Sequence, residues 1–303
     1  MSVDRRPSRR ELLRIGGASL AAIPLAAVLA ACSGDDSSND EQNGSGGDAD
    51  SSAVAMGTWN IASRWIPTEL VPGEQRLPVS LADASGLVMD GPSRLTASLV
   101  DLDTDEIVST GLFADRRTMG DDTVPFWVFR TAIDRVGTFS LVIDGGPEEG
   151  AAFQTFDPST LVVARTGQDL PPFDTPTTTD SRGVEEFCTR APEPCPFHAV
   201  TLTEALESGK PVVYLVGTPA HCQTGVCGPV LEQLIGLAED VGDSAVFVHA
   251  DVYADKAATV VAPAVEAAKL TFEPVLFVTD AQGRIVQRLD AIWDVEEVRE
   301  ALS

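Results

Sequence analysis

The stretch from Lys210 to Leu231, KPVVYLVGTPAHCQTGVCGPVL, constrains the fold more than any other part of the sequence. The apolar run 211–216 is typical of a buried strand, and a turn containing glycine and proline follows it. Apolar residues at helical spacing after Cys227 predict a helix. The sequence therefore predicts a strand that leads into a helix, with Cys222 and Cys227 at the junction. Because a helix N-terminus favours negative charge, cysteines placed there have lowered pKa values and reactive sulfurs.

The charge of the chain excludes one class of partner. Over 303 residues the formal net charge is −25, and the basic residues are scattered beyond the first fourteen positions. Proteins that bind nucleic acids need basic patches to contact phosphates, so we expect no nucleic-acid partner. The acidity is instead typical of a soluble, well-dispersed surface.

The first 32 residues have the pattern of an export signal. Residues 8–14 (SRRELLR) resemble the twin-arginine motif, and the apolar segment 15–31 that follows is short for a membrane-spanning helix. Leu29-Ala30-Ala31-Cys32 resembles a bacterial lipobox, which implies that Cys32 is diacylated and begins the mature protein. We therefore expect Tat export and a lipid anchor on the extracytoplasmic face of the cell membrane. An uncleaved N-terminal anchor is the alternative.

The remaining chain divides into four segments by composition. Residues 33–53 are almost entirely polar and predict a disordered acidic tether. Residues 54–166 contain about seven short alternating runs separated by turn signals, which predicts an antiparallel β-sandwich and resembles an immunoglobulin-like domain in architecture. This domain has no cysteine or histidine, so we expect a spacer or docking surface. A Pro/Thr-rich linker is predicted over 167–187, before a final domain over 188–303.

Export to an oxidising compartment favours disulfides. With Cys32 acylated, four cysteines remain: Cys188, Cys195, Cys222 and Cys227. Three connectivities are possible, and the close spacing within each pair favours 188 with 195 and 222 with 227.

The final domain, 188–303, alternates strands and helices. If 198–200 forms a short first strand, the order is β-α-β-α-β-α-β-β-α, which together with the cysteine position and Pro274 resembles a thioredoxin-like domain. The resemblance implies redox cysteines between the second strand and its helix, with Pro274 as a cis-proline opposite them. In that fold the start of the first strand faces away from Cys222. We therefore expect Cys188 and Cys195 to form a structural disulfide at the opposite pole.

The site departs from the family pattern in two ways: the cysteines are further apart in sequence, and the buried acid is missing. Four residues separate Cys222 and Cys227, and residues five apart on a helix lie about 7.5 Å apart along its axis. A disulfide therefore requires a loop or a distorted turn at 223–226, for which Gly225 is suited. The strand 212–216 lacks the buried acid of the family, so His221 is the candidate for proton transfer.

These patterns predict a membrane-tethered thiol–disulfide oxidoreductase that acts on exported proteins, with Cys222 as attacking and Cys227 as resolving thiol. A thiol peroxidase is an alternative, because Thr218-Pro219 and the cysteine spacing are similar to those of some peroxiredoxins. Copper(I) delivery through the cysteines with His221 or His249 is another. The non-enzymatic alternative is an envelope interaction protein with two structural disulfides. We expect no cofactor, a monomer and an unidentified redox partner.

Overall fold

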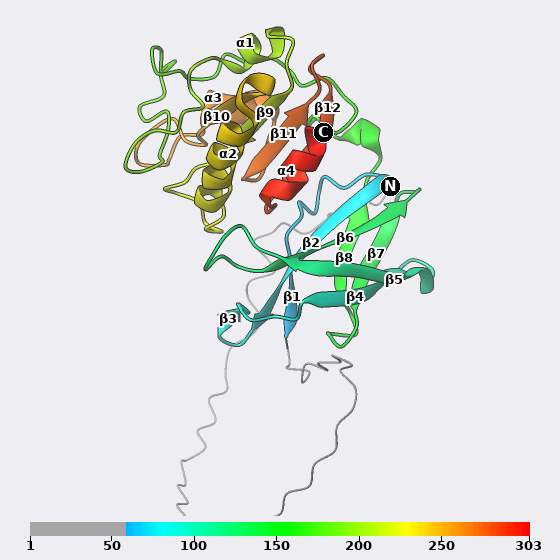
Figure 1. Cartoon of the computed structure of the whole chain (residues 1–303). Helices are drawn as coiled ribbons and strands as arrows, with labels where there is room; N and C mark the ends of the chain where they lie inside the picture. The colour runs from blue at the N-terminus through cyan, green and yellow to red at the C-terminus, as the bar shows by residue number, and fades with distance from the viewer. Residues whose placement is uncertain (1–58) are drawn as a thin grey trace, which may run out of the picture. The chain divides into compact units, whose positions relative to one another are not determined.

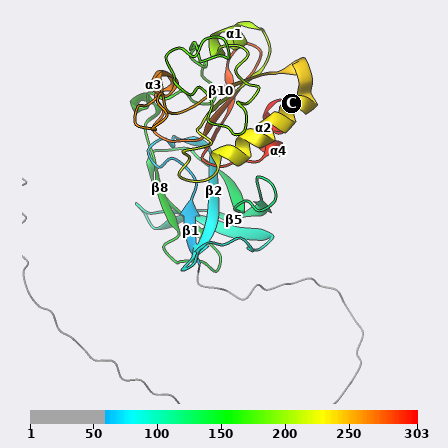
Figure 2. The same cartoon turned by 90° about the vertical axis from the view of Figure 1, so that its left-hand side faces the viewer.

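The computed structural model describes residues 59–303, which belong to one compact unit (Figures 1 and 2). The predicted signal segment, the lipidated Cys32 and the acidic tether lie outside the described residues. Within residues 59–303, no helix has the length and hydropathy needed to cross a membrane.

The first half of this unit is an eight-stranded antiparallel sheet. Its strands are β1 (Asn60–Ser63), β2 (Gly73–Asp83), β3 (Gly86–Leu87), β4 (Arg94–Asp101), β5 (Glu106–Arg117), β6 (Phe126–Ile133), β7 (Gly137–Ile143) and β8 (Ala151–Thr155). The order is β1-β2-β6-β5-β4-β7-β8, with β3 beside β2, and the end strands β1 and β8 approach one another. The predicted β-rich domain is confirmed in this coarser form, as a nearly closed sheet.

Strand β5 joins all these strands into one hydrogen-bonded sheet. Most of β5 pairs with β4, whereas its last residues, Arg116 and Arg117, pair with β6. The inner face carries alternating apolar residues, such as Leu77 and Val79, that are fully buried. This period of two is the one expected for strands that bury a single face.

The second half is a four-stranded sheet with helices on both faces. Its elements are α1 (Leu202–Glu207), β9 (Val212–Val216), α2 (Cys227–Val241), β10 (Val246–Ala250), α3 (Pro263–Ala268), β11 (Val275–Thr279), β12 (Ile285–Asp290) and α4 (Val295–Ala301). The order is β10-β9-β11-β12, with β9 and β10 parallel and the other pairs antiparallel. Helices α2 and α4 pack on one face (Figure 1), and α1 and α3 pack on the other. Coverage on both faces explains why β9 is a continuous apolar run.

The predicted first strand at 198–200 is wrong, because the structure has a turn there. Pro194 and Pro196 precede it and lack the N–H groups that a ladder requires. Only a single backbone hydrogen bond, from the His249 N–H to the Phe197 carbonyl, joins this segment to β10. The segment 188–198 is therefore free to take another path.

Ion pairs join the two sheets. The carboxylate of Glu297, in the first turn of α4, accepts hydrogen bonds from Arg76 of β2 and Arg130 of β6, at 2.6–2.8 Å. Arg117 of β5 donates to Asp294, the N-cap of α4, at 2.9 Å. The side chain of Glu297 is only 1% exposed, so its buried charge is compensated by the largely buried Arg76 and the half-exposed Arg130.

Candidate active site

The two cysteines predicted to react lie side by side. Cys222 is in the loop after β9, and Cys227 is the first residue of α2. A turn closed by a hydrogen bond from the Gly225 N–H to the Cys222 carbonyl folds this loop back, with Gly225 at φ +69°. The sulfur atoms lie 2.7 Å apart, and both residues are free thiols in this structure. The four-residue spacer thus forms the predicted loop, and the pair can close.

The surroundings of the two sulfurs differ. The Cys222 sulfur accepts hydrogen bonds from the Cys227 thiol and the Cys227 N–H, and it lies 3.3 Å from the Thr224 hydroxyl. The Cys227 thiol and then Thr224 lower the pKa of Cys222 to about 5. The hydrogen bond to Cys222, burial and the charge of Glu273 raise the pKa of Cys227. At neutral pH, Cys222 is therefore the part-exposed thiolate and Cys227 the buried thiol.

Glu273 supplies the acid that the sequence interpretation did not find. Its Oε2 lies 3.5 Å from the Cys227 sulfur and accepts a hydrogen bond from the Thr218 N–H at 2.9 Å. Burial, and then the negative charge of Cys222, raise the pKa of Glu273 to about 7. Strand β9 carries no acid, but the predicted position of Pro274 was a usable signal, because Glu273 immediately precedes it. A carboxyl with this pKa can accept or return the Cys227 proton near neutral pH.

Pro274 lies next to the cysteine pair. The Glu273–Pro274 peptide bond is cis, and β11 begins at the following residue. A Cβ added at Gly217 would lie 3.3 Å from the Pro274 Cβ and 3.6 Å from the Cys227 sulfur. The glycine at the end of β9 therefore permits the close approach of Pro274 and Cys227.

His221 contacts an aromatic ring in this structure. Its imidazole packs edge-on against Tyr253, with ring centroids 5.8 Å apart. Among the described residues, no hydrogen bond joins the His221 ring to either thiol. The role of His221 in proton transfer stays a prediction, whereas Glu273 is already in contact with Cys227.

The Cys188 and Cys195 pair lies at the same end of the sheet as the reactive pair, so the predicted opposite pole is wrong. Both sulfurs approach Nδ1 of His249, which is at the carboxyl end of β10. The His249 Nε2–H donates to the carbonyl of Gly217, immediately after β9. Because no first strand forms, the segment crosses to this end. Both residues are free thiols here, and their disulfide stays a prediction.

Thr189 connects the two cysteine sites. Its N–H and its hydroxyl both donate to Asp251, at 2.9 and 2.7 Å. The same hydroxyl accepts from the Ala220 N–H at 3.2 Å and lies 3.2 Å from the Thr218 hydroxyl. The residue that follows Cys188 is thus hydrogen-bonded to the loop that carries Cys222.

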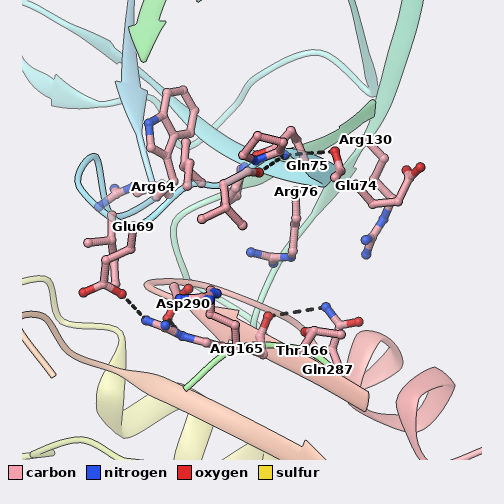
Figure 3. Close-up of a pocket in the computed structure, with 18 residues that line it drawn as sticks. Arg64, Glu69, Glu74, Gln75, Arg76, Arg130, Arg165, Thr166, Gln287 and Asp290 are labelled. Atoms are coloured by element: carbon pink, nitrogen blue, oxygen red, sulfur yellow. Dashed lines mark hydrogen bonds and ion pairs between the residues drawn. The ribbon is translucent and has the colours of Figure 1, made fainter. Parts of the chain in front are cut away.

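A cavity of about 410 Å³ lies between the two sheets (Figure 3). Figure 3 shows residues of β2 facing Gln287 and Asp290 of β12. Five arginines line it: Arg64, Arg76, Arg130, Arg165 and Arg288. Three of the five are paired with carboxylates, two with Glu297 and the third with Glu69 and Asp290. The lining comes from β2, β6, β12 and the loops beside them, which places the cavity at the contact between the sheets.

Comparison with known proteins adds no family to this geometry. No protein-family model matches the chain, and no curated protein matches it. Any function must therefore be argued from the residues themselves.

Proposed function

We propose that this chain is a thiol–disulfide oxidoreductase that exchanges disulfides through Cys222 and Cys227. One observation carries the proposal: a part-exposed sulfur lies 2.7 Å from a buried one at the start of α2, with a carboxylate 3.5 Å from the buried thiol. This arrangement provides a nucleophile, a resolving thiol and a proton acceptor. Each group has a pKa that suits its role.

In the reducing direction, the Cys222 thiolate attacks one sulfur of a substrate disulfide. The substrate S–S bond breaks, a mixed disulfide forms, and the leaving thiolate takes a proton from solvent. Glu273 then accepts the proton of Cys227, whose sulfur attacks that of Cys222. This step forms the Cys222–Cys227 bond and releases the second substrate thiolate. The substrate gains two electrons and the cysteine pair loses two; oxidation of a dithiol substrate reverses these steps.

The proposal includes the fold of each half. The sheet β10-β9-β11-β12, with α2 and α4 on one face, is what remains of a thioredoxin-like domain when its first strand is absent. The antiparallel strands β1–β8 are proposed as an immunoglobulin-like spacer or docking domain. Fold alone does not establish activity, so the cysteine geometry carries the assignment.

The proposal also includes location and partners. The twin-arginine and lipobox patterns support anchoring through Cys32 to the extracytoplasmic membrane face. We further propose a monomer, with exported proteins as substrates and a separate redox partner for recycling. Replacing Cys32 by Ser should move the protein from the membrane to the soluble fraction. Membrane retention of this variant would contradict a lipid anchor.

The redox potential of the Cys222–Cys227 couple tests the activity. A value between about −120 and −270 mV supports exchange, whereas a value below about −300 mV indicates a structural bridge and a non-enzymatic protein. Insulin-disulfide reduction provides a second readout. Cys222→Ser should abolish it, while Cys227→Ser should trap a mixed disulfide on Cys222. Consumption of hydrogen peroxide by the reduced protein, without insulin reduction, would replace this proposal by a thiol peroxidase.

A further inference from the structure

Four buried side chains form a second cluster with the composition of a metal site: Cys188, Cys195, His198 and His249. Cys188 and Cys195 are 5% and 3% exposed, and both histidines are fully buried. One potential ligand atom from each residue lies within 4.8 Å of the other three. The proposed redox mechanism uses none of these residues.

Hydrogen bonds fix the orientation of both imidazoles. The His249 Nε2 lies 2.9 Å from the carbonyl oxygen of Gly217, and the His198 Nδ1 lies 3.4 Å from that of Pro176. Because carbonyl oxygens only accept, these outer nitrogens carry the protons. The inner nitrogens, Nδ1 of His249 and Nε2 of His198, then present lone pairs to one another at 3.2 Å. Carbonyl partners of this kind are typical of histidines that bind metals.

The distances between the ligand atoms match the edges of a tetrahedron. With Zn–S near 2.3 Å and Zn–N near 2.05 Å, tetrahedral geometry requires S···N separations of about 3.6 Å and an N···N separation of about 3.3 Å. The Cys188 and Cys195 sulfurs lie 3.7 and 3.4 Å from the His249 Nδ1, and the two inner nitrogens lie 3.2 Å apart. The three edges that meet at the His249 Nδ1 thus match a tetrahedron, and all four ligand atoms lie within 4.8 Å of one another.

Charge points in the same direction. Cysteines bind metals as thiolates, and two buried thiolates need a cation beside them. A divalent ion with two thiolates is neutral overall, as burial favours.

We propose that Cys188, Cys195, His198 and His249 bind one Zn²⁺ in a closed, tetrahedral, structural site. Two thiolates and two imidazoles are a common ligand set for structural zinc, and burial of all four leaves no open position for catalysis. The group formed by Cys222, Cys227 and Glu273 is different, because it offers three ligands and is partly exposed. The zinc proposal replaces the expected Cys188–Cys195 disulfide and does not depend on the proposed redox activity.

The test loads the reduced full chain with Zn²⁺ and measures bound metal after dialysis. One equivalent per chain is expected. The double variant Cys222→Ser/Cys227→Ser should keep this equivalent, whereas His198→Ala and His249→Ala should lose most of it. Because these histidine variants could fold poorly, Co²⁺ is also added to the wild type. Thiolate-to-cobalt charge-transfer bands and intense tetrahedral visible bands are expected.

Three results would overturn the proposal. The first is no zinc retained by the reduced wild type. The second is zinc lost in the Cys222→Ser/Cys227→Ser variant but kept in the histidine variants. The third is a Cys188–Cys195 disulfide found by peptide mass analysis of protein isolated from its cell envelope without reductant.

Discussion

Replacement of Glu273 by Gln separates the proton chemistry of the site from its shape. Gln is nearly isosteric, and its oxygen can still accept the hydrogen bond that Thr218 donates at 2.9 Å. It cannot accept the proton of Cys227, whose sulfur lies 3.5 Å away. The variant therefore removes the proton acceptor and keeps the packing.

The rate effect follows from the step in which Glu273 acts. Proton transfer by a positioned side chain contributes about 10²–10⁴-fold to a rate. We expect the attack of Cys222 on the substrate to be nearly unchanged and resolution by Cys227 to slow by at least about 10²-fold. In the wild type the resolution rate should fall as pH drops below about 7, because protonated Glu273 accepts no proton. The variant should lack this dependence.

The free energy of unfolding should depend on pH in the opposite direction to the resolution rate. Burial raises the pKa of Glu273 from 4.5 to about 7, so the folded state favours the protonated form. The wild type consequently loses stability as pH rises from about 4.5 through 7. The shift corresponds to about 3 kcal/mol, which solvent screening of this part-exposed carboxyl reduces to roughly 1–2 kcal/mol. Glu273→Gln should remove this loss, which urea unfolding of the reduced protein at pH 4.5 and 8 would measure.

The assay is rapid mixing of the reduced protein with a peptide disulfide, followed by acid quenching and mass analysis of the mixed disulfide. Accumulation of this species in Glu273→Gln is the expected result. Glu239→Gln, an exposed change on α2, is the matched control and should behave as wild type. Equal resolution rates in Glu273→Gln and wild type between pH 6 and 8 would refute the assignment of Glu273 as proton acceptor.

Three further predictions concern single contacts. The rate of alkylation of Cys222 should rise with pH with a midpoint of about 5, the pKa of its thiol. A midpoint near the ordinary value of 9.0 would contradict the hydrogen bonds to its sulfur. Gly225→Ala should cost about 1–2 kcal/mol of unfolding free energy, because alanine is strained at a φ of +69°. No atom lies close enough to clash with the added Cβ, so backbone strain is the whole cost. An unchanged urea midpoint would contradict this. Arg76→Ala should cost about 3–5 kcal/mol, since it leaves the buried Glu297 carboxylate without its closest partner; a loss below about 1 kcal/mol would indicate that Arg130 compensates alone.

The sequence predicted local structure well where chemistry is local. Thr201 and Glu204 form a capping box at α1 and Asp294 caps α4, and both are patterns that a sequence shows locally. The run before Cys222 is the buried strand β9. The first strand at 198–200 failed because its prediction relied on a complete family order and ignored Pro194 and Pro196, which remove backbone donors.

The site was predicted in part, for a related reason. Cys222 and Cys227 come together because strand, turn and helix signals are close in sequence, whereas Pro274 reaches them through the pairing of β11 with β9. The contact of Glu273 with Cys227 and the cluster around His249 depend on strands that meet only in the folded sheet. The place of Glu273 before Pro274 was a usable signal for the first, whereas no local pattern reveals the second. The single nearly closed sheet likewise depends on how β5 divides its hydrogen bonds between β4 and β6.

The hydrogen bonds of Thr189 have a thermodynamic consequence. They connect the residue after Cys188 to Thr218 and Ala220, so the two cysteine sites share a hydrogen-bond network through which they can be coupled. Binding free energies linked in this way are reciprocal. If zinc binds the reduced form tenfold more tightly than the oxidised form, the potential of the Cys222–Cys227 couple rises by about 30 mV. Oxidation of that couple weakens zinc binding by the same factor, so neither site can be titrated as if it were alone.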